Sequence, residues 1–110
     1  MGQSTKWQEL LRVQDEAEMR VVSLGEEPDG SLVIEERSDG EVTLLSFGNL
    51  TCVRSVRLAS GACSSDEVEA FFLAGEPFLS DFQDRLDGKG IEYSYAMTTG
   101  NDIALRPRSV

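Results

Sequence analysis

The sequence predicts an α+β fold: an antiparallel β-meander of about six strands, with an N-terminal helix and two central helices packed on one face. Two observations support this prediction. Residues rich in β-formers fill 19–26 and 31–47, and turn signals bound or divide both stretches. Apolar residues at helical spacing then dominate 64–87. With 110 residues, we expect one domain, 1–110, large enough to bury its own core.

At the N-terminus, residues 5–16 predict a short helix. Thr5 and Gln8 have the spacing of a capping box, in which each side chain binds the other residue's backbone N–H. The apolar stripe of this helix, at spacings i, i+3 and i+4, consists of Trp7, Leu10 and Leu11.

The centre of the predicted sheet is a hairpin within residues 31–47. Asp39-Gly40 divides this stretch, and such a pair is preferred in two-residue hairpin turns. The turn would set Ile34 opposite Leu45, and alternate pairs along the hairpin would share a face. The apolar face of the hairpin would consist of Leu32, Ile34, Leu45 and Phe47.

A second turn signal, Glu27-Pro28-Asp29-Gly30, joins residues 19–26 to this hairpin. In the register that the turn sets, Leu24 lies opposite Ile34 and Val22 lies opposite Glu36. Leu24 and Val22 then fall on the apolar face of the hairpin. Two separate turn signals therefore predict one core surface.

Gly48-Asn49 predicts a third tight turn, after which residues 50–58 return as a fourth strand. In this register Arg54 lies opposite Thr43, whose other neighbour is Glu36. The arrangement predicts a cross-strand ion pair between Arg54 and Glu36 near the margin of the sheet.

Two helices and two strands complete the predicted fold. Ser64 and Glu67 have capping-box spacing at the start of a helix that Gly75 ends, and Pro77 fits the first turn of a helix at 77–87. The apolar stripes of the two helices consist of Val68, Phe71 and Phe72, and of Phe78, Leu79, Phe82 and Leu86. Alternation in 91–97 and a short run at 102–106 before Pro107 predict the last two strands.

Ten basic and twenty acidic residues give the chain a net charge of −10. This charge repels nucleic-acid phosphates and anionic lipids and favours a basic protein partner. The acidic residues are concentrated in 15–41, and the order of the meander predicts that most of them gather at one end of the sheet. Acidic residues also serve turns, helix caps and solubility, which is the alternative explanation. The candidate partner-binding residues are Asp15, Glu16, Glu18, Glu35, Glu36, Asp39 and Glu41.

The sequence contains no catalytic, cofactor-binding or metal-binding motif. It has no histidine, and Cys52 and Cys63 lack the spacing of metal ligands, so we expect two free thiols. Gly88-Lys89-Gly90 lacks the spacing of a phosphate-binding loop. We therefore expect neither enzymatic activity nor a cofactor. No apolar run approaches the roughly 20 residues of a membrane span, and the N-terminus lacks a signal-peptide core, so we expect a cytoplasmic protein.

In size, acidity and its predicted build of meander and helices, the chain resembles the small acidic immunity proteins of bacterial polymorphic-toxin and contact-dependent growth inhibition systems. This resemblance rests on overall style across the whole chain. It implies a non-catalytic protein that binds a cognate toxin domain, often a basic nuclease, and blocks it. Charge complementarity assigns that contact to the candidate acidic residues above.

Two alternatives remain open at this point. The chain has the size and acidity of a secretion chaperone, which dimerises to hold a segment of an effector protein. It could also be a small ligand-binding or enzymatic domain with a pocket between sheet and helices. The aromatic residues that could line such a pocket are Trp7, Tyr93 and Tyr95.

Overall fold

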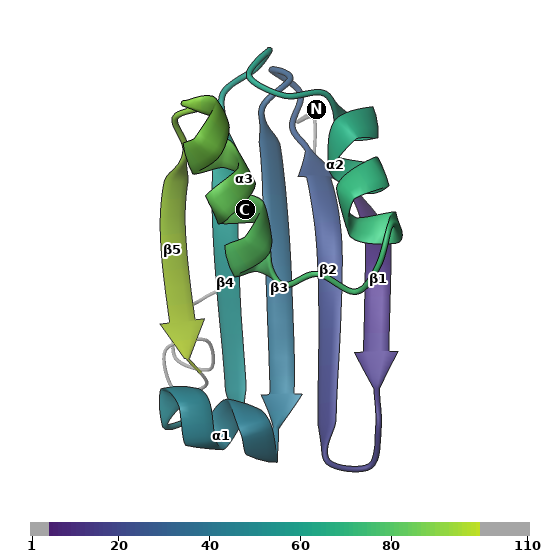
Figure 1. The fold of residues 1–110 in the computed structure, drawn as a ribbon, viewed down its shortest axis with the longest axis vertical. Helices are drawn as coiled ribbons and strands as arrows, with labels where there is room; N and C mark the ends of the chain where they lie inside the picture. The colour runs from purple at the N-terminus through teal and green to yellow at the C-terminus, as the bar shows by residue number, and fades with distance from the viewer. Residues whose placement is uncertain (1–4, 100–110) are drawn as a thin grey trace, which may run out of the picture.

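The computed structural model describes residues 5–99, which form a five-stranded antiparallel sheet and three helices (Figure 1). The strands are β1 (Lys6–Gln14), β2 (Glu18–Glu26), β3 (Leu32–Gly40), β4 (Thr51–Leu58) and β5 (Ser94–Thr99). The helices are α1 (Glu41–Phe47), α2 (Ser65–Leu73) and α3 (Leu79–Lys89). The strand order is β1-β2-β3-β4-β5, so the sheet is a meander. The expected α+β class and antiparallel meander are therefore confirmed.

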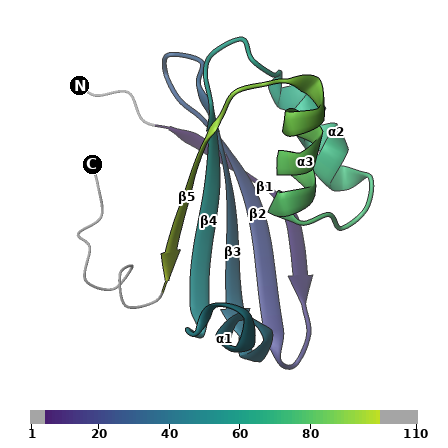
Figure 2. The same ribbon diagram turned by 60° about the vertical axis from the view of Figure 1, so that its left-hand side comes forward.

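The described residues form two layers, a sheet and the helices on one of its faces. Helices α2 and α3 cover the upper half of that face, and α1 crosses the lower end of the sheet (Figures 1 and 2). The described part of the chain measures 37 × 36 × 21 Å, and the short axis matches one sheet and one helical layer. Among residues 5–99 no helix covers the opposite face of the sheet.

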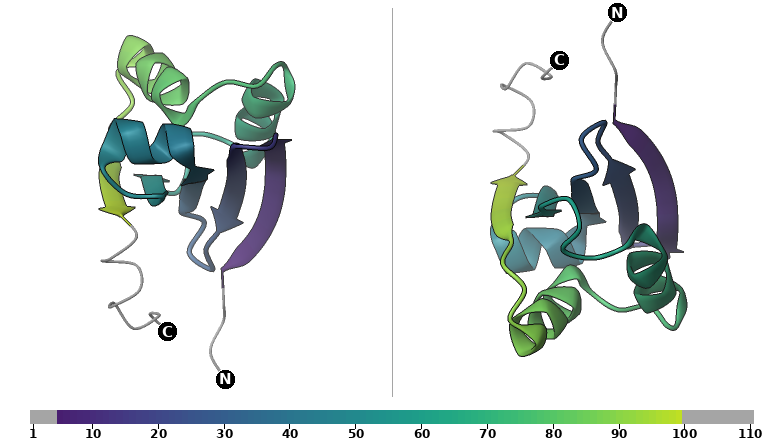
Figure 3. Two further views of the ribbon diagram at one scale, coloured as in Figure 1. Left: turned by 90° about the horizontal axis from the view of Figure 1, so that it is seen from below. Right: turned by 90° about the horizontal axis from the view of Figure 1, so that it is seen from above.

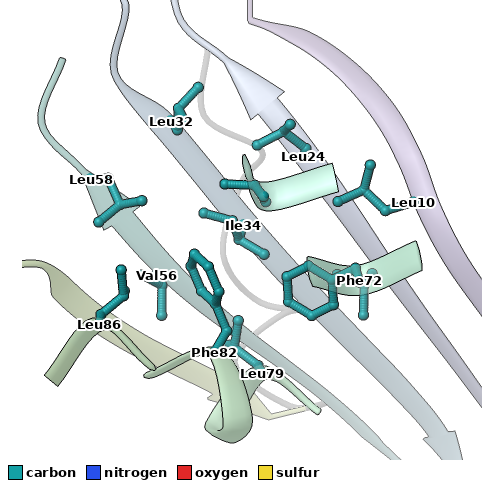
Figure 4. Packing of buried hydrophobic residues seen from close by; sticks show 12 residues of the cluster. Leu10, Leu24, Leu32, Ile34, Val56, Leu58, Phe72, Leu79, Phe82 and Leu86 are labelled. Carbon is teal, nitrogen blue, oxygen red and sulfur yellow. The ribbon is translucent and has the colours of Figure 1, made fainter. Parts of the chain in front are cut away.

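The hydrophobic core lies between the sheet and helices α2 and α3 (Figure 4). Its aromatic centre is formed by Phe72 and Phe82, whose ring centroids are 5.5 Å apart. Each fully buried side chain of this size contributes roughly 1.5–3 kcal/mol to folding. The core residues are Leu10, Val22, Leu24, Leu32, Ile34, Val56, Leu58, Val68, Phe72, Leu79, Phe82 and Leu86.

The hairpin between β2 and β3 has the predicted register. Leu24 pairs with Ile34 and Val22 pairs with Glu36. Gly30 has a φ of +91° at the turn, where glycine avoids the steric cost of a side chain. The single core surface that the turn signals predict is therefore confirmed for β2 and β3, and β4 adds Val56 and Leu58 to it.

The predicted N-terminal helix is wrong, because residues 6–14 form strand β1. A β-bulge between Glu9 and Leu11 inserts one extra residue into the strand. As a result Leu10 is buried in the core and Leu11 packs against the same core. Trp7 lies opposite Gly25. The bulge therefore turns both Leu10 and Leu11 toward the core, while Trp7 stays outside it and is 52% exposed, so the three residues do not form the single stripe expected of a helix.

The predicted hairpin turn at Asp39-Gly40 is also wrong. A type I′ turn needs positive φ at both residues, but only glycines have positive φ among the residues described. Residues 41–47 form helix α1 instead, and β3 pairs directly with β4. Gly48, expected in a tight turn, closes α1 in the left-handed conformation. Leu45, expected in the core, is 87% exposed.

The remaining differences are smaller. Strand β5 begins at Ser94 rather than at residue 91, and α3 covers 79–89 rather than 77–87. The start of α2 agrees with the prediction, since Ser64 and Glu67 form the expected capping box. The strand predicted at 102–106 lies outside the described residues.

We expect Ser64→Ala to lower the free energy of unfolding by about 1 kcal/mol, because it removes the N-cap of α2. The Ser64 backbone N–H and hydroxyl lower the pKa of Glu67. The contribution of Glu67 is therefore present above its unfolded-state pKa and is lost as pH falls through its folded-state pKa. Urea unfolding at neutral and acidic pH measures both effects. Ser65→Ala, which removes the neighbouring hydroxyl, is the control, and an equal loss in both variants would contradict the capping role.

Candidate functional site

Five of the seven candidate acidic residues gather at one end of the sheet. We call this the α1 end, where the β1–β2 turn, the end of β3 and helix α1 meet (Figure 3). The strand register sets Glu18 opposite Gly40 and Met19 opposite Asp39. Glu35 and Glu36 lie further along β3, on opposite faces of the sheet. The residues at the α1 end are Asp15, Glu16, Glu18, Asp39 and Glu41.

Two of these carboxylates organise the local backbone. Glu18 accepts hydrogen bonds from the N–H groups of Val42 (3.1 Å) and Thr43 (3.2 Å) and from the Thr43 hydroxyl, so it caps the N-terminus of α1. Asp15 Oδ1 accepts the N–H groups of Ala17 (2.8 Å) and Glu18 (2.9 Å) in the β1–β2 turn. The alternative explanation, in which acidic residues serve turns and caps, therefore accounts for both.

The other three carboxylates at the α1 end differ in how free they are to bind a partner. Asp39 accepts a hydrogen bond from the Thr51 hydroxyl at 2.6 Å and forms an ion pair with Arg37 at 3.0 Å. Glu16 and Glu41 are exposed and take part in none of the ion pairs between described residues. These two carboxylates are therefore the candidates that are free to meet a partner.

Glu36 is buried, with 1% of its surface exposed, and is inaccessible to a partner surface. Its carboxylate pairs with Arg20 at 3.3 Å and with Arg54, which confirms the predicted Arg54–Glu36 pair. The pair lies beneath the helices rather than at the margin of the sheet. Glu36 also accepts the N–H of Leu79 at 2.9 Å, at the start of α3.

The two arginines of this cluster are held by further groups. Arg20 donates to the carbonyl oxygens of Glu76 (2.9 Å) and Pro77 (2.7 Å) and stacks on the Phe78 ring at 4.3 Å. For Arg54, burial acts to lower the pKa, but the hydrogen bond and charge of Glu36 outweigh it and the pKa is raised. Arg20 therefore ties the sheet to the α2–α3 connection, whereas Arg54 is held by Glu36 on the neighbouring strand.

Helix α1 and the segment that follows it expose apolar side chains at the same end of the molecule as these acidic residues. Leu45 is 87% exposed, and Val42 and Leu50 are each 57% exposed. Glu16 and Glu41 lie at the same end of the molecule. We call this patch the α1 surface, and it consists of Glu16, Glu41, Val42, Leu45 and Leu50. The sequence analysis missed it because the mistaken hairpin turn placed Leu45 in the core.

A pocket of about 510 Å³ lies between the sheet, α1 and the α2–α3 connection. Its walls combine apolar side chains with carboxylates, and the carboxylates outnumber the two arginines. The lining residues are Val13, Asp15, Glu18, Arg20, Glu36, Ser38, Val42, Thr43, Ser46, Phe47, Arg54, Glu76 and Phe78. The aromatic residues suggested for such a pocket lie elsewhere. Trp7 lines a smaller pocket of about 170 Å³ near α2, and Tyr93 and Tyr95 line neither of the two.

Cys52 is buried, Cys63 is half-buried, and both are free thiols, as predicted. Burial raises the pKa of each thiol, which disfavours the reactive thiolate. Within residues 5–99 no group of three or more His, Cys, Asp or Glu side chains is arranged to hold a metal ion.

Comparison of the chain with models of known protein families, with curated proteins and with solved structures finds no match. The helices described here are too short and too polar to cross a membrane.

Proposed function

We propose that the chain is a non-catalytic binding protein, an immunity protein that neutralises a basic toxin domain, such as a nuclease, of a bacterial toxin–immunity system. The observation that carries this proposal is the α1 surface, where exposed apolar side chains lie beside carboxylates. A small apolar centre with a polar rim is the usual anatomy of a protein–protein interface.

The apolar part of the α1 surface supplies the affinity in this proposal. Leu45 projects from a helix that is itself held by the Glu18 cap, so the side chain is presented without ordering a loop. Burying an apolar side chain of this size against a partner contributes roughly 1.5–3 kcal/mol. Side chains that are fully buried near the centre of an interface carry most of its binding energy.

The charge distribution supplies the preference for a basic partner. The described basic side chains are largely consumed in ion pairs within the molecule, such as Arg12 with Glu9 at 2.8 Å and Arg37 with Asp39 at 3.0 Å. Glu16 and Glu41 at the α1 surface have no such partner among residues 5–99. A negative field of this kind raises the rate of association with a cationic protein by 10-fold or more and weakens as salt is added.

The experiment uses the product of the gene beside the one for this chain, which the proposal expects to carry the toxin domain. The toxin domain is expressed in growing cells with and without this protein, and the purified pair is measured by calorimetry. The expected result is arrested growth with the toxin domain alone and restored growth when both are present. A non-toxic neighbouring gene product, or toxicity that the chain does not relieve, would refute the proposal.

We expect Leu45→Asp to weaken binding of this toxin domain by about 10- to 100-fold, because it replaces the central apolar contact with a charge. The fold should persist, since the side chain is exposed. Leu73→Asp makes the same change at an exposed leucine of α2, outside the α1 surface, and should leave affinity unchanged. Calorimetric titration of both variants checks this, and equal affinities for the two would contradict the assignment of the α1 surface.

A further inference from the structure

We propose that the pocket beside α1 receives a lysine or arginine side chain of the partner. This inference rests on the proposed function and gives it a specific chemistry, the capture of one cationic side chain in a preformed cavity. The pocket borders the α1 surface, because Val42 belongs to both. A partner seated on the α1 surface therefore lies within reach of the cavity.

The walls match a long cationic side chain. Such a side chain needs apolar contact for its methylene stem and oxygen acceptors for its head group. Val13, Val42 and Phe47 supply apolar wall, and Asp15, Glu18 and Glu76 supply carboxylates. The volume of about 510 Å³ falls in the range of ligand-binding cavities, roughly 300–1,000 Å³.

The two arginines of the pocket do not make it an anion site. Arg20 and Arg54 already share the carboxylate of Glu36, and Arg20 donates to two backbone carbonyls as well. An anionic ligand would have to displace Glu36, which is buried, and approach against the net charge of −10. A cation meets neither obstacle.

The carboxylates at the pocket keep capacity for a ligand. Asp15 takes both hydrogen bonds of its turn on Oδ1, which leaves Oδ2 without a partner among the described residues. Glu76 is exposed, and only its backbone carbonyl is used by Arg20. Asp15 and Glu76 therefore each retain carboxylate oxygens that can bind a cationic side chain of a partner.

The aromatic rings of the pocket already accept guanidinium groups. Phe78 stacks on Arg20 at 4.3 Å, and Phe47 lies 5.5 Å from Arg54. Phe78 nevertheless remains 52% exposed. Cation–π attraction favours a cation placed over the face of such a ring. The same chemistry is available to a side chain that enters from a partner.

The experiment titrates the full chain with N-acetyl-arginine N-methylamide, a cation without a carboxylate, and follows backbone amide shifts by NMR. N-acetyl-citrulline N-methylamide is the neutral control of the same shape. We expect saturable shifts at Thr43, Ser46 and Phe78 with the arginine probe, and tenfold weaker binding of the citrulline probe. Any of three results would overturn the inference. They are equal binding of the arginine and citrulline probes, preferred binding of N-acetyl-aspartate N-methylamide, and shifts that spread over the acidic surface without saturation.

Matched variants separate the pocket from overall charge. Asp15→Asn with Glu76→Gln should weaken the arginine probe about tenfold. Glu26→Gln with Asp84→Asn removes the same charge at exposed positions outside the pocket and should change its affinity less than twofold. Equal losses in the two double variants would show that only net charge matters and would overturn the inference.

A blocking variant connects the pocket to the partner. Ser46→Trp fills the cavity from α1, and we expect it to abolish probe binding and weaken toxin binding by 10-fold or more. Ser80→Trp, on the exposed side of α3, is the control. If Ser46→Trp binds and neutralises the toxin domain normally, the pocket inference fails while the proposed function stands. If the unaltered chain does not bind the toxin domain, the proposed function fails, whatever the probe does.

Discussion

Glu36→Gln is expected to lower the free energy of unfolding by about 3–5 kcal/mol, the cost of removing one partner from a buried ion cluster. The substitution keeps the shape of the side chain and removes only its charge. It leaves Arg20 and Arg54 without the carboxylate that both of them bind. Their side chains are only 10% and 16% exposed, so water replaces little of what is lost.

The effect should spread beyond the strands, because Glu36 also accepts the N–H of Leu79 at the start of α3. An amide oxygen keeps this acceptor but binds more weakly than a carboxylate. Amide hydrogen exchange should therefore show faster opening of α3 in Glu36→Gln before global unfolding.

The neighbouring Glu35 provides a matched control. It lies on the face of the sheet that no described helix covers, and it is only partly buried. We expect Glu35→Gln to change stability by less than about 0.5 kcal/mol. Urea unfolding measures both variants. A loss below 1 kcal/mol in Glu36→Gln would show that the two guanidinium groups are solvated, contrary to the structure.

The contrast between these neighbours shows where sequence reasoning ends. The turn from Glu27 to Gly30 and the cap of α2 at Ser64 could be predicted because each signal involves residues close in sequence. The same reasoning grouped Glu35 and Glu36 as surface candidates. The strand register predicted the pair with Arg54, 18 residues away, but no local pattern revealed that Arg20 and the start of α3 would also close over Glu36.

Helix α1 shows the same limit. Its seven residues are too few to be stable alone, and the sequence carries no local N-cap for it, since Gly40 has no side chain. The cap comes from Glu18, more than 20 residues earlier in the chain. The meander order predicted that Glu18 and Glu41 share one end of the sheet. Helix α1, and with it the exposure of Leu45, could not be predicted, because the helix depends on the tertiary contact with Glu18.

Gly40→Ala is expected to lower the free energy of unfolding by about 3 kcal/mol or more, from backbone strain and steric overlap together. Gly40 has φ 136° and ψ −167°, a conformation open almost only to glycine. An added Cβ would lie 2.8 Å from Glu18 Cα and closer still to the Ala17 carbonyl oxygen. These are backbone atoms of the β1–β2 hairpin, so the overlap cannot be relieved by turning a side chain.

The steric overlap lies at Glu18, the residue that caps α1. Gly40→Ala should therefore disturb the α1 surface as well as lower the free energy of unfolding. Displacement of Glu18 frees the N–H groups of Val42 and Thr43, and their hydrogen exchange should accelerate more than that of β2. Gly88→Ala is the control, because an added Cβ there meets no atom within 4 Å and α3 is an ordinary helix. We expect it to raise stability by about 0.5–1 kcal/mol. Urea unfolding measures the change in the free energy of unfolding for both variants. Changes of opposite sign would support a fixed junction between β3 and α1, and equal changes would refute it.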